Sequence, residues 1–124
     1  MTTTTWQSTT SVASEACPGV EFVIARISFG RRLELMKRVR EMAVRLEYFD
    51  AGREEKNRIE ASLLGAQLDR MYIEWGLEGV RGLEIDGETA TPVSLVERGP
   101  EELFQEALAA VKAECGLSDE QRKN

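Results

Sequence analysis

Two long amphipathic stretches, separated by a short break, constrain the fold of this chain most strongly. In residues 31–50 apolar side chains recur at alternating spacings of four and three, the pattern of one face of an α-helix. They are Leu35, Val39, Met42, Leu46 and Phe49. The second stretch starts at Glu54 and Glu55, whose carboxylates suit the positive end of a helix, and runs to Trp75. Because so short a break joins two long helices, we predict an antiparallel helical hairpin.

The apolar stripe of the second helix is unusually wide. It consists of Ala61, Leu64, Leu68, Met71 and Trp75, flanked by Ile59, Leu63 and Ile73. This width predicts burial on more than one side, and it makes Leu68, Met71 and Trp75 candidates for partner contact. Two interpretations of Trp75 stay open: a core residue that closes one end of the hairpin, or an anchor that faces a partner.

The N-terminal segment is rich in serine and threonine. Nine of the first fourteen residues are Ser or Thr, and Trp6 is the one bulky side chain among them. Such a segment buries too little apolar area to offset its ordering entropy, so we predict that residues 1–18 are a disordered arm. The arm is either an ordinary free terminus or a segment that orders against a partner, with Trp6 as its anchor.

Short strands are predicted on both sides of the helical hairpin. Val20, Phe22 and Ile24 alternate with Glu21 and Val23, which predicts a strand with a slip of phase near Ala25. After the hairpin, three evenly spaced glycines end the helical pattern: Gly76, Gly79 and Gly82. Residues 83–85 and 88–90 then flank Asp86-Gly87, a pair preferred in tight β-hairpin turns. We expect residues 83–85 to pair with residues 20–24 in a small sheet.

Two helices are predicted in the C-terminal part. Thr91 is a suitable N-cap before Pro92, and the short helix over residues 93–96 ends at Gly99. The last helix follows Pro100-Glu101-Glu102 and ends at Gly116. Its apolar stripe contains Leu103, Phe104, Ala107, Leu108, Val111 and Cys115. The predicted fold is therefore α+β and mostly α, with one globular domain at residues 19–117 and a polar tail at residues 118–124.

Charge and composition exclude several functional classes. The chain has 124 residues and a net charge of −6, which argues against general nucleic-acid binding. Its apolar runs are too short to cross a membrane, and it begins without a secretory signal, so we expect a cytoplasmic protein with reduced cysteines. Residues 31–45 are nonetheless basic, and Arg38 and Arg45 lie on their polar face. This face either compensates an acidic neighbouring helix or binds an acidic partner.

No cluster of residues predicts catalysis or metal binding. The chain lacks histidine, and Cys17 and Cys115 therefore have no imidazole to activate them. Glu84, Asp86 and Glu88 straddle a tight turn, where carboxylates are usually solvated, and they lack the spacing of a calcium loop. We therefore expect a protein without enzymatic activity, metal or cofactor.

The order of elements resembles the tail assembly chaperones of long-tailed bacteriophages and prophages. The resemblance rests on a helical pair, Trp75-Gly76-Leu77-Glu78-Gly79-Val80, the Ile85-Asp86-Gly87 turn, the Thr91-Pro92 helix, and Gly99-Pro100-Glu101-Glu102-Leu103 before a final helix. It covers about residues 20–124, and the Ser/Thr-rich arm is not part of the family pattern.

The resemblance implies a non-catalytic function in the host bacterial cytoplasm. A protein of this family would bind the long helical tape measure protein, keep it soluble and assist assembly of the tail tube protein, and self-association is compatible with this role. Two alternatives from other classes stay open. One is a structural virion connector subunit, and the other is a small adaptor that binds an acidic partner through the basic face of residues 31–50.

Overall fold

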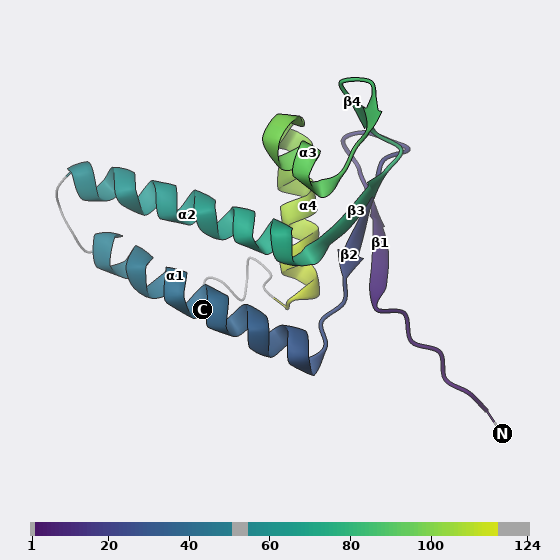
Figure 1. The fold of residues 1–124 in the computed structure, drawn as a ribbon, viewed down its shortest axis with the longest axis horizontal. Helices are drawn as coiled ribbons and strands as arrows, with labels where there is room; N and C mark the ends of the chain where they lie inside the picture. Colours follow the sequence, from purple (N-terminus) through teal and green to yellow (C-terminus); the bar gives the residue numbers. More distant parts are fainter. Residues whose placement is uncertain (1, 51–54, 117–124) are drawn as a thin grey trace.

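The computed structural model describes residues 2–50 and 55–116, which form a mixed α+β fold that is mostly helical (Figure 1). The strands are β1 (Thr9–Ala13), β2 (Glu21–Ala25), β3 (Leu77–Arg81), β4 (Glu84–Ile85) and β5 (Glu88–Thr89). The helices are α1 (Phe29–Asp50), α2 (Glu55–Gly76), α3 (Pro92–Arg98) and α4 (Glu101–Glu114). The predicted fold class is thereby confirmed, and the predicted C-terminal tail lies outside the described residues.

The three longer strands form an antiparallel sheet in the order β1-β2-β3, and β4 and β5 form a separate hairpin. The whole α1–α2 hairpin lies in the connection between β2 and β3. It extends from one side of the sheet as a long arm (Figure 1). Inside that arm, α1 contacts α2 extensively and other elements only slightly.

The prediction that residues 1–18 are disordered is wrong for β1, which pairs with β2 from Thr9 opposite Ala25 to Ala13 opposite Glu21. Strand pairing satisfies main-chain donors and acceptors without a large apolar side chain, and Thr and Val favour extended backbone. The polar composition of the arm therefore did not reveal its ability to extend a sheet edge.

The partner of β2 also differs from the prediction, because β3 pairs with it and the strand at residues 84–85 does not. The pairing has an irregularity: Val23 lies opposite Gly79 and Ile24 lies opposite Leu77. One residue of β3 is thus inserted, and Leu77 and Val80 are both buried although they are three positions apart. This insertion removed the alternation by which a strand is recognised in sequence.

The turns and caps form as their residue types predicted. Asp86 and Gly87 have positive φ angles of 54° and 81°, as a two-residue hairpin turn requires. The Thr91 hydroxyl accepts a hydrogen bond from the Ser94 N–H, and the Ser94 hydroxyl accepts one from the Thr91 N–H. This reciprocal capping box fixes the start of α3.

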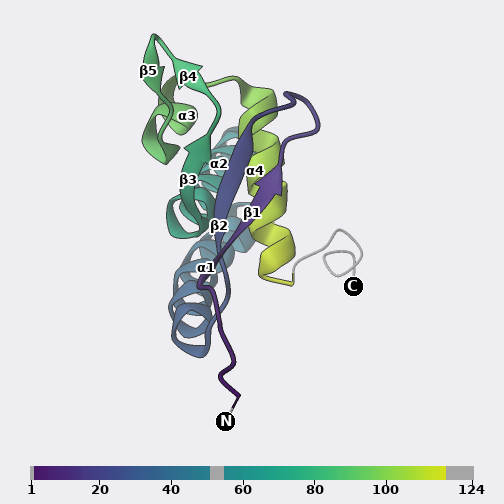
Figure 2. The ribbon, with the colours of Figure 1, turned by 90° about the vertical axis from the view of Figure 1, so that its right-hand side faces the viewer.

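The core lies where α4 and the end of α2 cover one face of the sheet (Figure 2). Its fully buried large side chains come from four elements, namely β2, α2, the short α3 and α4: Phe22, Ile24, Ile73, Leu95, Leu103 and Val111. Gly82 lies beside this core at a close approach to Gly19. A Cβ atom there would stand 2.1 Å from the Gly19 carbonyl oxygen, and the φ of Gly82 is +77°, so only glycine fits this approach.

Candidate functional site

The outer face of α1 exposes large apolar side chains in a row. Phe29 is 85% exposed, Leu33 47%, Met36 60% and Val44 60%. With 3.6 residues per turn, these four residues and Arg40 fall within an arc of about 80° on the helix. We call Phe29, Leu33, Met36 and Val44 the α1 stripe. Single exposed apolar residues are normal on protein surfaces, but a row along one helix face indicates an interaction site.

A groove of about 580 Å³ runs beside the α1 stripe, between α1 and the end of α4. We call it the α1 groove, and its lining residues are Ile27, Arg32, Leu33, Leu35, Met36, Lys37, Val39, Arg40, Tyr72 and Cys115. Leu33 and Met36 belong to both the groove and the stripe. Apolar side chains thus continue from the core, through the groove, to the outer surface of the helix.

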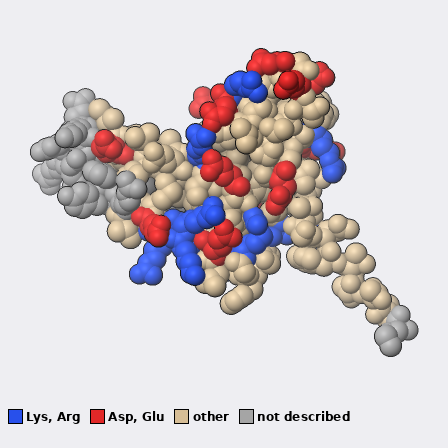
Figure 3. Space-filling model, in the orientation of Figure 1, with Lys and Arg blue, Asp and Glu red and all other residues tan. Residues whose placement is uncertain are grey.

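Among the described residues, all charged side chains that line the α1 groove are cationic: Arg32, Lys37 and Arg40. Figure 3 shows Lys and Arg side chains, with Asp and Glu side chains among them, over the lower part of the molecule, where α1 lies. Within the described side chains none of the three forms an ion pair, whereas Arg38, on another face, binds Glu34 at 2.7 Å. The rim of the groove therefore has uncompensated positive charge.

The acidic residues of α2 pair elsewhere. Arg70 contacts Glu74 at 2.9 Å and Glu97 at 2.5 Å, and Lys112 contacts Asp69 at 3.2 Å. Among the side chains that the structure describes, no ion pair joins α1 to α2. Within the described side chains the complementary charges of the two segments thus do not meet across the hairpin, and both interpretations of the basic segment stay open.

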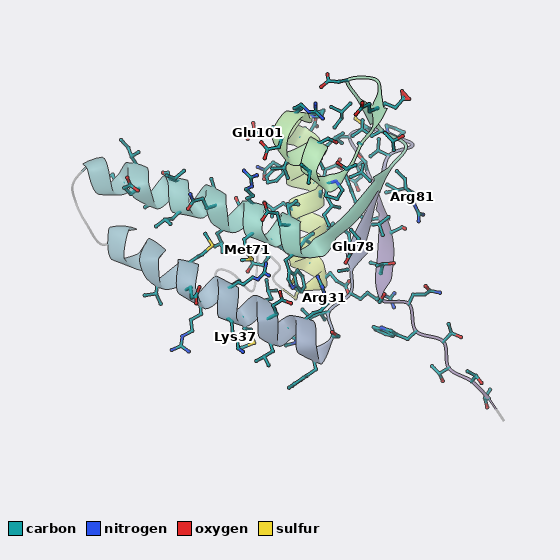
Figure 4. All side chains as sticks on the ribbon, viewed as in Figure 1. Arg31, Lys37, Met71, Glu78, Arg81 and Glu101 are labelled. Atoms are coloured by element: carbon teal, nitrogen blue, oxygen red, sulfur yellow. The ribbon has the colours of Figure 1, made fainter. Side chains whose placement is uncertain are left out.

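Arg31 ties the first turn of α1 to the end of α2. Its guanidinium lies over the Trp75 ring, 4.6 Å from the centroid, and donates a hydrogen bond to the Trp75 carbonyl oxygen. The same contact binds a positive group to the negative C-terminal end of α2. Arg31 Nε and Trp75 Nε1 are buried and have no hydrogen-bond partner in the structure. Figure 4 shows Arg31 at the junction of α1, α2 and α4.

Cys115 forms part of the groove wall and is buried. Burial, and to a smaller extent nearby Glu114, raises the pKa of its thiol to about 11, although Arg32 and Arg31 act to lower it. At neutral pH the thiol is therefore protonated, and Cys115 acts as a small apolar surface of the groove.

The residues predicted to contact a partner do not form one surface. Trp75 is only 5% exposed, so it is the core residue of the first interpretation and not an exposed anchor. Leu68 and Met71 are partly buried against the core, and Figure 4 shows Met71 between α1 and α2. Arg38 is exposed on a face away from the groove lining.

The remaining two predicted residues are Arg45 and Trp6. Arg45 belongs to the residues whose side chains the structure does not describe. Trp6 is 68% exposed, and the Arg26 guanidinium lies 5.0 Å from the centre of its ring. A role for Trp6 as a partner anchor stays a prediction.

The α1 stripe was missed because the core-facing stripe of the same helix dominates the sequence pattern. A signal was present: Phe29, Leu33, Met36 and Val44 repeat at helical spacing about two fifths of a turn from the core positions. A helix with apolar residues over so wide an arc has more apolar surface than one neighbour can cover.

The described residues contain neither a cluster of three or more potential metal ligands nor a helix long and apolar enough to cross a membrane. No protein-family model, no curated protein and no solved structure matches this chain.

Proposed function

We propose that this protein is a non-enzymatic phage tail assembly chaperone that binds helical segments of a tape measure protein in the bacterial cytoplasm. The observation that carries the proposal is the α1 stripe beside the α1 groove. A chaperone for a long helical protein needs exposed apolar surface shaped to receive a helix, and an exposed apolar row beside an apolar groove provides it.

The order of elements supports the same proposal. The helical pair, the short strands after Trp75, the Asp86-Gly87 turn and the two C-terminal helices occur in the order that the resemblance requires. None of these elements alone is specific for the family, so the exposed surface of α1 carries more weight than the order.

The genetic test is the nucleotide sequence through the codon of Lys123 and beyond. We expect a slippery heptamer, an overlapping reading frame and then a very long, helix-rich open reading frame. A clean stop codon with unrelated neighbouring genes would contradict the proposal.

The biochemical test is co-expression with the product of that long reading frame. The chaperone should increase the soluble fraction of the tape measure protein and be recovered with it on affinity purification. The double variant Leu33→Asp/Met36→Asp should lose both effects. The matched control, Ile59→Asp/Leu63→Asp, changes two exposed apolar residues of α2 and should keep them.

The structural connector is distinguished by the composition of finished particles. A chaperone leaves the completed tail, so purified virions should not contain this chain. Its presence in stoichiometric amount would favour the connector.

A further inference from the structure

The α1 groove combines an apolar floor with an exclusively cationic rim, and this combination indicates the chemistry of its ligand. We propose that the α1 groove selects an amphipathic helix whose apolar stripe is flanked by carboxylates. The inference rests on the proposed function, because it specifies which helical segments of the partner α1 binds.

The dimensions of the groove fit a helix. Its α1 lining extends from Arg32 to Arg40, a length of about 12 Å at 1.5 Å per residue, or roughly two helical turns. Over two turns an opposing helix presents apolar side chains at positions i, i+3 or i+4, and i+7. Leu33 is 47% exposed and Met36 is 60% exposed, so both can interdigitate with them.

The cations lie on both sides of the apolar row. Taking Leu33 and Met36 as the centre line, Arg32 falls on one flank and Lys37 on the other, while Arg40 continues the row toward Val44. Carboxylates on both flanks of a bound helix would therefore meet a positive charge, and lysines there would meet like charge.

The charges that face the groove from other elements do not cancel this rim. Tyr72 from α2 and Cys115 from α4 are the lining residues contributed by those helices, and Cys115 is uncharged at neutral pH. Glu114 adjoins Cys115 in sequence but is not a lining residue. A nucleic acid is a poor occupant because the whole chain has a net charge of −6.

The test uses two fluorescein-labelled peptides of about 20 residues, long enough to form a helix. Both have the same leucine stripe; one has glutamates on its flanks and the other has lysines. Fluorescence anisotropy of each is measured against the full chain. We expect the glutamate peptide to bind about tenfold more tightly, with the difference shrinking between about 50 and 500 mM salt.

The variant Arg32→Glu/Lys37→Glu/Arg40→Glu should invert the preference. The matched control Arg58→Glu/Arg81→Glu/Arg98→Glu changes the net charge equally at exposed sites outside the groove and should keep it. Circular dichroism melting curves of both variants verify that they fold.

Several results would overturn the inference. Equal binding of both peptides would remove charge selection and leave the proposed function intact. If the control variant also inverted the preference between the two peptides, that preference would depend on the net charge of the chain alone. Binding of neither peptide, or self-association that the groove variant abolishes, would assign the groove another occupant. Co-purification with the tape measure protein tests the proposed function separately in each case.

Discussion

Helices α4 and α1 are both amphipathic, but they use their apolar faces differently. In α4 the stripe of Leu103, Ala107, Leu108 and Val111 is buried against the sheet and α2. In α1 the residues of the α1 stripe face solvent, and α2 is the main neighbour of the helix. α4 thus has a partner for its apolar surface within the chain, whereas α1 has more apolar surface than the described residues cover.

This difference separates stability from recognition. Burial of a large apolar side chain stabilises the fold by about 1.5–3 kcal/mol. The buried side chains of α4 make this contribution. The α1 stripe contributes almost nothing to folding and exposes surface that favours association. Such a surface lowers the free energy only when a partner covers its apolar area.

The largest effect is expected for Leu103→Ala in α4. Leu103 is fully buried in the core, so the substitution removes apolar contacts and leaves a cavity. We expect a loss of about 2–5 kcal/mol in the free energy of unfolding, measured by urea denaturation. A loss below about 1 kcal/mol would mean that α4 is not the centre of the core.

A smaller effect is expected for Arg31→Ala, at the place where α1 is tied to α2. The substitution removes the stacking on Trp75 and the hydrogen bond to its carbonyl oxygen. We expect a loss of about 1–3 kcal/mol and a changed Trp75 emission, recorded in a Trp6→Phe background. Arg38→Ala is the matched control, since its ion pair with Glu34 is exposed and should contribute less than about 0.5 kcal/mol.

A pH-dependent effect is expected for Glu106→Gln. The α4 carboxylate accepts hydrogen bonds from the Ser14 hydroxyl at 2.5 Å and from the Glu15 and Ala16 N–H groups at 2.8 and 3.3 Å. The Ser14 hydrogen bond, followed by the one from Glu15, lowers the pKa of Glu106.

The lowered pKa of Glu106 determines how its contribution to stability changes with pH. A carboxyl with a lowered pKa in the folded state stabilises the protein above its ordinary pKa of about 4.3, and this contribution is lost as pH falls through the folded-state value. The melting temperature of the wild type should exceed that of Glu106→Gln at pH 7, and the difference should shrink toward pH 3. A constant difference over this range would contradict the prediction.

The smallest effect on stability is expected for Leu33→Ala in the α1 stripe. Leu33 is half exposed, and alanine has the higher helix propensity, so the free energy of unfolding should change by less than about 0.5 kcal/mol. The same substitution should weaken peptide binding in the anisotropy assay. A destabilisation as large as that of Leu103→Ala would show that the stripe belongs to the core.

The long helices, the Asp86-Gly87 turn and the Thr91 cap were predictable because local residue patterns determine them. Helix α4 was predictable for the same reason, since its apolar residues follow a single helical stripe that the core covers. The strands β1 and β3 were not, because pairing in a sheet depends on a distant chain segment. The inserted residue in β3 also places Leu77 and Val80 three positions apart, so the alternation typical of a strand is not visible in the sequence.

The candidate site was predictable only in part. The basic character of residues 31–45 was visible in the sequence, but the cations that line the groove are Arg32, Lys37 and Arg40. Arg38 lies on another face of the same helix, and Arg31 turns inward to Trp75. Which cation faces the groove depends on how α1 is rotated against α2, and charge counting along the chain does not determine that rotation.

The placement of the α1–α2 hairpin between two neighbouring strands has a consequence for how such chains can diversify. The sheet needs the hairpin to return the chain to β3, but it does not need a particular hairpin length (Figure 1). Insertion of about seven residues, two turns, in both helices would lengthen the arm and leave the faces of each helix nearly in phase. Related chains are therefore expected to conserve the sheet and its helix α4 while their arms vary in reach by whole pairs of turns.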